Sequence, residues 1–202
     1  MGLRVPKKKY SVAEYLELER SSEERSEYLD GDILLMAGES REHADISSNL
    51  LREIGNQLKG TACRAWTKDM KVRSGPAPEN ATTTKGLYSH PDIVVVCGEP
   101  EFHDAHTDIL LNPKVIIEIL SESTEAFDRG EKFTRMQKWN PTLTDYVLIS
   151  QDKPQIEHFA KPRKGAWTYQ LFTGLDAQVE ISSIHSTLKM TDVYDRVIFP
   201  EG

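Results

Sequence analysis

The chain has 202 residues, of which 38% are hydrophobic and 28% charged, with a formal net charge of −7. This length and composition are those of an ordinary globular domain with a buried core, rather than of a disordered or fibrous chain. No apolar run approaches the roughly 18 residues of a membrane helix, so we expect no membrane association. The basic first ten residues have no apolar stretch behind them, so we expect no secretory signal.

The first half of the chain predicts a helix, a hairpin, a second helix and strands. Ser11 and Glu14 form a capping box at the start of the first helix. Asp30–Gly31 lies between two apolar-rich runs, which is a hairpin signal because Gly supplies a positive φ. Apolar residues recur every four positions from 46 to 58 within a predicted helix over 40–59. Strands are expected over 62–73 and 93–97, and the Gly, Pro, Ser and Thr of 74–90 predict a loop.

The second half predicts further core strands and a third helix. Buried strands are expected over 114–120 and 145–150, because both runs are rich in β-branched residues. Between them, residues 125–139 read as a helix that Pro141 ends. A hairpin over 155–160 and 166–172 and a short helix over 190–196 complete the chain. We therefore predict an α/β (α+β) fold, a mixed β-sheet core flanked by helices, with a basic N-terminal tail over 1–9 and a single domain over 10–200.

Cys63 and Cys97 are the two cysteines of the chain, and they are far apart without metal-ligand spacing. Two cysteines cannot form a disulfide framework, so we predict free, small buried side chains in a reducing cytoplasm.

The acidic net charge counts against indiscriminate binding to nucleic acid, but the charge is unevenly distributed. Residues 1–10 carry +4 and residues 11–45 carry −8, with eleven acids and three bases. One basic stretch, residues 59–73, includes Lys68, Lys71 and Arg73. These three are candidate contacts to substrate phosphates if they share a face, and otherwise belong to a solvated surface.

Two carboxylates lie where burial makes charge costly. Asp92 immediately precedes the apolar run 93–97, and Glu118 lies inside the apolar strand 114–120. Alternation along that strand puts Glu118 on the face of Ile116 and Leu120. If the two strands are neighbours, both acids can hold one ion, and oxygen ligands suit Mg²⁺. The alternative is structural, with Asp92 capping a turn at the end of a strand and Glu118 pairing with an Arg or Lys.

The motifs together resemble the Uma-type restriction-endonuclease-like family of the PD-(D/E)XK nuclease superfamily. The matching segments span roughly residues 10–195, and they occur in the family's order and spacing: 27–31, 36–38 with His43, 91–96, 118–121, 123–124, 128–133 and 145–149. The resemblance implies a restriction-endonuclease-like fold and hydrolysis of DNA with Mg²⁺, for which Mn²⁺ can substitute, leaving a 5′-phosphate and a 3′-hydroxyl. It also implies a homodimer.

The resemblance also implies residue roles. Asp92 and Glu118 would be metal ligands, with the Ile119 carbonyl as a third. Lys132 would replace the lysine that the superfamily usually carries two residues after the acid, where this chain has Leu120. Glu27 would join the site directly or through water, and His43 matches a family position that contacts phosphate or lies on a helix surface.

A second departure from the family pattern is Met136, where relatives often have Tyr. Methionine can replace a packing role but not a hydroxyl. The alternative functions are a catalytically inactive nucleic-acid- or protein-binding member of the same fold, or a structural protein in which both acids stabilise the chain. A hydrolase using a histidine is less favoured, because no Ser lies in a nucleophile-elbow sequence.

Overall fold

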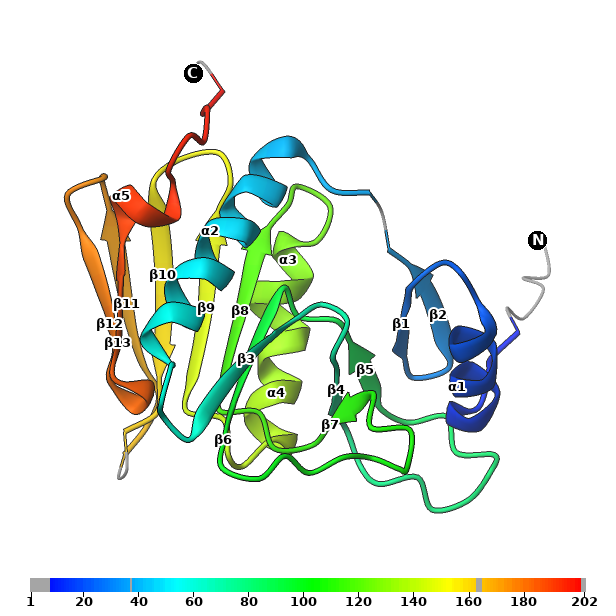
Figure 1. Ribbon diagram of the computed structural model, residues 1–202. Helices are drawn as coiled ribbons and strands as arrows, with labels where there is room; N and C mark the ends of the chain where they lie inside the picture. Colours follow the sequence, from blue (N-terminus) through cyan, green and yellow to red (C-terminus); the bar gives the residue numbers. More distant parts are fainter. Residues whose placement is uncertain (1–7, 37, 163–164, 201–202) are drawn as a thin grey trace.

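The computed structural model describes residues 8–36, 38–162 and 165–200. Its centre is a six-stranded mixed sheet in the order β11-β10-β9-β8-β6-β3, in which β8 and β9 run parallel and the other neighbours antiparallel (Figure 1). The strands are β3 (Cys63–Thr67), β6 (Ile93–Cys97), β8 (Val115–Leu120), β9 (Asp145–Ser150), β10 (Gln155–Ala160) and β11 (Thr168–Thr173). All six were predicted, and the α/β class with a mixed sheet between helices is confirmed.

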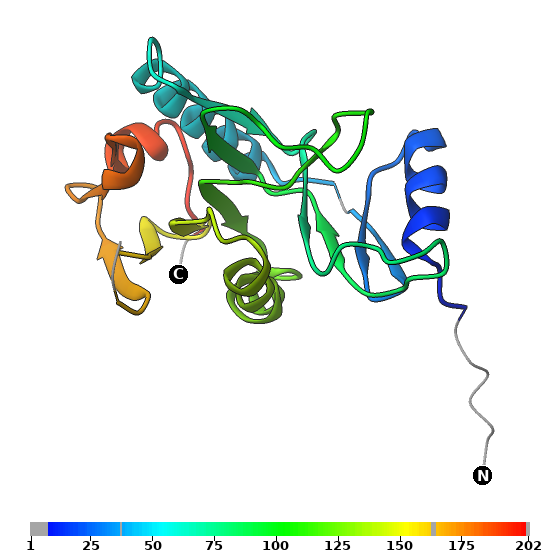
Figure 2. The ribbon, with the colours of Figure 1, turned by 90° about the horizontal axis from the view of Figure 1, so that it is seen from below.

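Helices cover both faces of this sheet (Figure 2). On one face, α2 (Arg41–Gln57) and α5 (Met190–Val193) pack against the apolar residues of β8 that include Ile117 and Ile119. On the other face, α4 (Phe133–Trp139) packs against Ile116 and Leu120. The predicted alternation of β8 is therefore confirmed, and Glu118 faces α4.

The helix α2 has the predicted four-residue apolar repeat, and Ile46, Leu50 and Ile54 are fully buried. Its N-cap is Ser40, whose side chain accepts a hydrogen bond from the amide of His43 at 3.0 Å. This cap ends the preceding loop and places His43 in the first turn of the helix.

A second sheet of five strands lies beside the first, in the order β2-β1-β5-β4-β7. Its strands are β1 (Ser26–Leu29), β2 (Asp32–Leu35), β4 (Lys71–Ser74), β5 (Leu87–Ser89) and β7 (Ile109–Leu110), and α1 (Val12–Ser21) covers it. The predicted capping box of α1 and the hairpin are confirmed. Asp30 and Gly31 adopt φ values of 45° and 93°, as a tight hairpin turn requires.

Strands in three regions were not predicted, and one of them is the two-residue strand β7. Residues 74–90 were expected to be a loop, but Leu87–Ser89 forms β5, which pairs with β1 and β4. A three-residue strand between glycines and prolines has too short a pattern to be recognised, and its neighbours in the sheet stabilise it. The strands β12 (Gln178–Ile181) and β13 (Ser186–Lys189) form a separate hairpin that the sequence pattern did not indicate.

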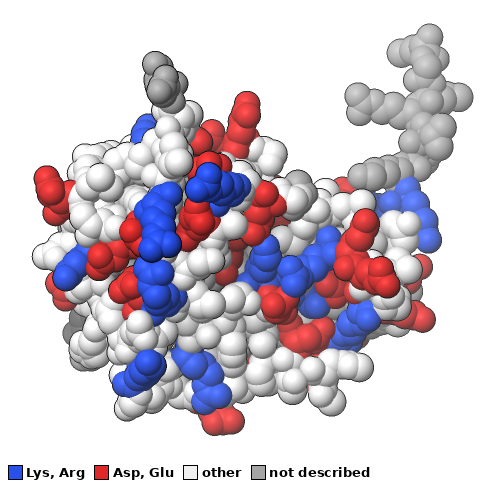
Figure 3. Space-filling view, turned by 45° about the horizontal axis from the view of Figure 1, so that its top comes forward, with Lys and Arg blue, Asp and Glu red and all other residues white. Residues whose placement is uncertain are grey.

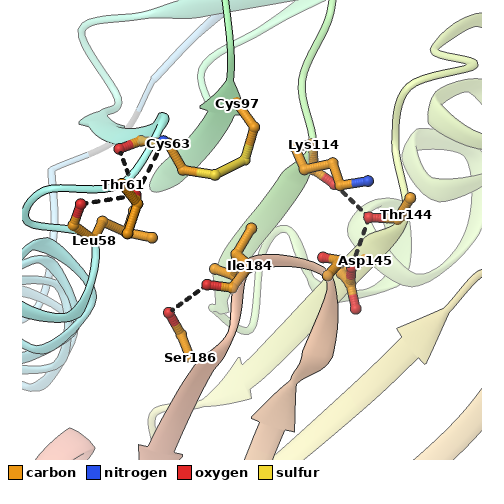
Figure 4. The surroundings of a disulfide bond; sticks show 10 residues. Leu58, Thr61, Cys63, Cys97, Lys114, Thr144, Asp145, Ile184 and Ser186 are labelled. Atoms are coloured by element: carbon orange, nitrogen blue, oxygen red, sulfur yellow. Dashed lines mark hydrogen bonds between the residues drawn. A yellow bond between two sulfur atoms is a disulfide. The ribbon is translucent and has the colours of Figure 1, made fainter.

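The cysteine prediction was wrong. Cys63 and Cys97 form a disulfide that joins β3 to β6 (Figure 4). The antiparallel register pairs these two residues directly, although 34 positions separate them in the chain. The pairing was invisible in the sequence because β3 pairs with β6 while β4 and β5 join the other sheet. The cytoplasmic location was predicted from free thiols. Because both cysteines are in a disulfide, it remains a prediction without that support.

Removal of this disulfide is expected to destabilise the protein. Closing a loop of this length restricts the unfolded chain, which corresponds to about 3–4 kcal/mol of the free energy of unfolding. Urea denaturation should therefore show a lower midpoint for the Cys63→Ala/Cys97→Ala protein than for the wild type. Dithiothreitol should lower the wild-type midpoint and leave that of the double variant unchanged. Equal midpoints without reductant would contradict the expectation.

The predicted N-terminal tail lies largely outside the described residues, which begin at position 8. Lys9 extends to the hairpin, where its Nζ is 2.7 Å from Asp32 Oδ2. Within the described ranges, no helix combines the length and the apolar character needed to cross a membrane.

Candidate active site

Glu118 lies in the middle of β8 and is 4% exposed. Both neighbouring strands are buried, so its carboxylate cannot reach bulk water and must find partners on the α4 side of the sheet. Ionised carboxylates in such positions are paired or bound to a cation. The side chains that meet Glu118 therefore define the site.

A π-helical turn, Asp128–Lys132, provides two of these side chains. It separates α3 (Glu125–Phe127) from α4, so the predicted helix over 125–139 is confirmed but contains one wider turn. Asp128 and Lys132 are both buried on the face toward the sheet. The Tyr146 hydroxyl of β9 donates to the Asp128 carbonyl at 2.9 Å, which holds the turn against the sheet. Such turns often occur at functional sites.

The Lys132 ammonium lies among three carboxylates. Its Nζ is 2.9 Å from Glu118 Oε1, 3.2 Å from Asp128 Oδ1 and 3.5 Å from Glu27 Oε1. Glu27 comes from β1, and its Oε1 also accepts the backbone N–H of His90 at 2.9 Å. The cluster therefore joins the two sheets as well as the π-helical turn.

Asp92 lies between the end of the second sheet and the start of β6. Its Oδ2 accepts the backbone N–H of Ile119 at 2.7 Å, which fixes the carboxylate beside the residue that follows Glu118. Its Oδ1 lies 3.4 Å from Nε2 of His43. Asp92 is thus held between the Glu118 strand and the first turn of α2.

The charges of this site are unbalanced. Three carboxylates, from Glu27, Glu118 and Asp128, surround the Lys132 ammonium, and Asp92 lies close enough to act on Glu118. Burial raises the pKa of Glu118 well above its ordinary value, and although Lys132 opposes this, Asp128 and Asp92 raise it further. Burial acts to lower the pKa of Lys132, but the neighbouring carboxylates, Glu118 first, raise it well above its ordinary value. Lys132 is therefore protonated at neutral pH, and burial together with the neighbouring carboxylates disfavours the ionised form of Glu118.

The structure brings together the four residues predicted as catalytic, which are Glu27, Asp92, Glu118 and Lys132. The backbone N–H of Ile119 donates to Asp92, which brings this residue into the site. Its carbonyl remains a predicted metal ligand. His43 lies at the edge of the cluster, on the α2 side of Asp92.

The three predicted phosphate contacts lie in different surroundings. Lys68 forms an ion pair with Glu39, close to His43. Lys71 is 4% exposed, and its Nζ is 2.6 Å from Glu19 and 3.1 Å from Asp108, so it is enclosed rather than available to a ligand. Arg73 contacts the ring of His103 at 3.0 Å. These three side chains do not form one face.

The sequence reasoning did not assign a role to Asp128 or Glu39. Asp128 was visible as an acid four positions before Lys132, a spacing that places both side chains on one helical face. Glu39 lies four positions before His43, but it precedes the helix, so helical spacing could not place it. Asp128 is 3% exposed and is an intrinsic part of the cluster.

The two departures from the family pattern have structural counterparts. Leu120 packs in the α4-side core, and the ammonium that meets Glu118 comes instead from Lys132 in the π-helical turn. Met136 is fully buried, and its sulfur accepts a hydrogen bond from Ser74 Oγ at 2.8 Å. The side chain therefore fills a packed position beside the site.

A space-filling view shows Lys and Arg interspersed with Asp and Glu over the face that it presents, without one continuous basic area (Figure 3). A surface of this kind attracts nucleic acid weakly at long range.

The architecture is shared with a solved structure, described as the crystal structure of "a putative nuclease belonging to DUF820" from Anabaena variabilis. The match has a TM-score of 0.72 and covers 93% of this chain and 99% of that chain, at 21% sequence identity. At this identity the likeness establishes the fold alone. The protein thus has a nuclease-like α/β fold whose two sheets meet at a buried cluster of carboxylates.

The sequence comparisons are more specific. The model of the Uma2 family, described as "Putative restriction endonuclease", matches residues 12–191, and the chain belongs to this family. This confirms the resemblance inferred from the motifs. Two relatives from Synechocystis sp. are named uncharacterized proteins slr1290 and sll1609. The first is 34% identical, covering 96% of both chains, and the second is 30% identical, covering 85% of this chain and 92% of its own.

Proposed function

We propose that this protein is a nuclease that hydrolyses phosphodiester bonds in DNA with the help of a divalent cation. The observation that carries the proposal is the excess of buried negative charge around Glu118. Three carboxylates contact one ammonium group there and Asp92 lies beside them, and burial together with Asp128 and Asp92 raises the pKa of Glu118. Membership of a family described as restriction endonucleases supports the same reaction.

The donors suit a hard cation. Asp92, directly before β6, and Glu118, on the neighbouring strand β8, offer carboxylate oxygens, and the Ile119 carbonyl is the third predicted donor. Oxygen ligands of this kind favour Mg²⁺, and Mn²⁺ accepts the same ligands. We therefore propose that Asp92, Glu118 and Ile119 hold Mg²⁺ and that Mn²⁺ can substitute for it.

The residues of the cluster would have different roles in the reaction. A bound divalent cation acidifies a water molecule and polarises the scissile phosphate. Lys132 is protonated, so it does not accept a proton. Its ammonium would instead stabilise the negative charge that develops on the phosphate. Because the cation would neutralise Glu118, the ammonium that pairs with this carboxylate in the structure becomes available to substrate. Glu27 would hold Lys132 in place.

DNA is the proposed substrate, and the proposal includes a homodimer that would present two sites to two strands. His43 contacts Asp92, and Lys68 pairs with Glu39 beside His43, so these two are the predicted phosphate contacts closest to the cluster. Lys71 is enclosed and would not take this role. With mixed surface charge, binding should be weak and should fall steeply as salt increases.

Dialysis against EDTA followed by return of a cation tests the proposal. We expect the purified wild type to cleave plasmid or linear DNA with Mg²⁺ or Mn²⁺ and to show no cleavage in EDTA. The products should carry 5′-phosphate and 3′-hydroxyl ends, which end-labelling and ligation can check. A protein that cleaves neither single- nor double-stranded DNA with either cation would contradict the proposal.

The inactive binding protein remains the second candidate. It would bind DNA in gel-shift assays without cleaving it. Calorimetric titration with Mg²⁺ distinguishes the nuclease from the inactive binding protein. The nuclease should bind Mg²⁺, whereas an inactive site has usually lost the ion. The acidic net charge and Met136 favour this second candidate, whereas the carboxylates and lysine gathered in the cluster favour the nuclease.

A further inference from the structure

Asp92 has a second set of neighbours on the side away from Glu118. Glu39, His43 and Asp92 each direct one ligand atom toward the others, and these atoms all lie within 4.8 Å of one another. His43 Nε2 is 3.4 Å from Asp92 Oδ1, and His43 Nδ1 is 3.7 Å from Glu39 Oε1. Two adjacent ligands on one ion, each at about 2.1 Å from it, are roughly 3 Å apart in an octahedral site. One imidazole offers one ring nitrogen to an ion, and the 3.4 Å and 3.7 Å separations of the ring nitrogens from Asp92 and Glu39 are both near this value.

The histidine itself indicates that a ligand belongs here. His43 is 8% exposed, and its buried Nδ1 has no hydrogen-bond partner among the residues that the structure describes. Buried ring nitrogens nearly always have a partner, and an exception indicates a water molecule or an ion. Because the N-terminal turn of α2 is capped by Ser40, the position of the ring is set by the fold.

The chemistry of the donors differs from that of the Glu118 side. An imidazole nitrogen with two carboxylates suits a divalent transition metal, whereas Mg²⁺ prefers oxygen alone. We propose that Glu39, His43 and Asp92 form a second cation site, which takes Mn²⁺ or Zn²⁺ in preference to Mg²⁺ and shares Asp92 with the site proposed above. This inference rests on the proposed function only in that Asp92 serves both sites.

The Lys68 ammonium would compete with a metal cation for the Glu39 carboxylate. It forms an ion pair with this carboxylate, and the side chains of both residues are 28% exposed. A cation that binds Glu39 must displace this ammonium, and the partial exposure gives Lys68 room to move into solvent. Removing Lys68 should therefore tighten binding of the cation, whereas a direct phosphate contact would have no such effect.

Mn²⁺ titration of the cation-free protein, without nucleic acid, tests the site. Electron paramagnetic resonance gives the affinity, and electron spin-echo modulation from ¹⁴N reports an imidazole ligand directly. We expect wild-type Mn²⁺ to show this modulation. His43→Ala should abolish it and weaken one Mn²⁺ site by about tenfold or more. Lys68→Met should strengthen the site, and Glu118→Gln should leave the nitrogen signal in place.

His106→Ala is the matched control, because His106 is exposed and its loss should change neither affinity nor signal. His43→Asn guards against misfolding of the alanine variant, and thermal melting checks both. Wild-type Mn²⁺ without a nitrogen signal, or unchanged Mn²⁺ binding in a folded His43 variant, would overturn the inference. Either result would leave the proposal of DNA cleavage standing. A protein that binds Mn²⁺ through His43 and cleaves no DNA would contradict only the proposed function.

Discussion

Replacing Asp92 by Asn or Glu118 by Gln is expected to lower the rate of DNA cleavage by about a thousandfold or more at saturating Mg²⁺. In the proposed mechanism the cation would contribute several kcal/mol to stabilisation of the transition state, and a thousandfold corresponds to about 4 kcal/mol. Each amide keeps the shape of the carboxylate but removes the charge that binds the ion. Single-turnover kinetics on a labelled duplex measures the loss, and calorimetry should show weaker binding of Mg²⁺ in the same variants.

The stability of Glu118→Gln should change in the opposite direction. The pKa of Glu118 is raised in the folded state, so its ionisation opposes folding at pH values above its ordinary value of 4.5. The cation-free variant should therefore unfold at a higher urea concentration than the wild type at pH 8, by on the order of 1 kcal/mol, and the difference should shrink toward pH 4.5. A variant that loses activity and stability together would indicate a structural role instead.

Glu122→Gln is the matched control for this pair. Glu122 follows the same strand but is exposed, so its replacement should alter neither cleavage nor the pH dependence of unfolding. Full cleavage by both Asp92→Asn and Glu118→Gln would exclude Asp92 and Glu118 as ligands of a catalytic cation.

The composition of the site could be predicted where it depends on local pattern. Alternation along β8 correctly separated Glu118 from Ile117 and Ile119, because the side chains of a strand face opposite sides whatever its partners are. The position of Asp92 beside β8 required only that β6 and β8 be neighbours, and two apolar strands close in sequence are often neighbours.

The parts that could not be predicted depend on tertiary context. The π-helical turn buries Asp128, but its sequence reads as an ordinary helix, because Tyr146 and the sheet stabilise the wider turn from outside. The disulfide needed the pairing of β3 with β6, which skips two strands of the other sheet. The enclosure of Lys71 by acids of α1 and of the loop before β7 likewise follows from packing between distant segments.

Replacing Lys132 by Met is expected to destabilise the cation-free protein by about 3–5 kcal/mol at pH 8, the range for breaking one partner of a buried ion pair. The substitution removes the ammonium that faces Glu118, Asp128 and Glu27, and it leaves their charges buried without compensation. Urea denaturation monitored by tryptophan fluorescence measures the change. The same variant should lose DNA cleavage by a hundredfold or more, since the charge that supports the phosphate is gone.

The pH dependence distinguishes a loss of charge from a loss of packing. In the wild type, the raised pKa of Lys132 keeps its contribution to stability constant below the ordinary value of 10.5, and that contribution is lost only as the pH rises through the higher folded value. Any change between pH 5 and pH 8 in the variant therefore comes from the carboxylates. Without the ammonium their pKa values rise, so they take up protons as the pH falls and the deficit becomes smaller toward pH 5.

A divalent cation should restore part of the lost stability, because it supplies positive charge to the same carboxylates. Lys138→Met is the matched control on the same helix, since Lys138 is exposed and its replacement should change stability little at any pH. A Lys132→Met deficit of equal size at pH 5 and pH 8, with no recovery in Mg²⁺ or Mn²⁺, would mean that Lys132 contributes through packing alone. In that case the excess of negative charge around Glu118 would no longer support a cation at this site.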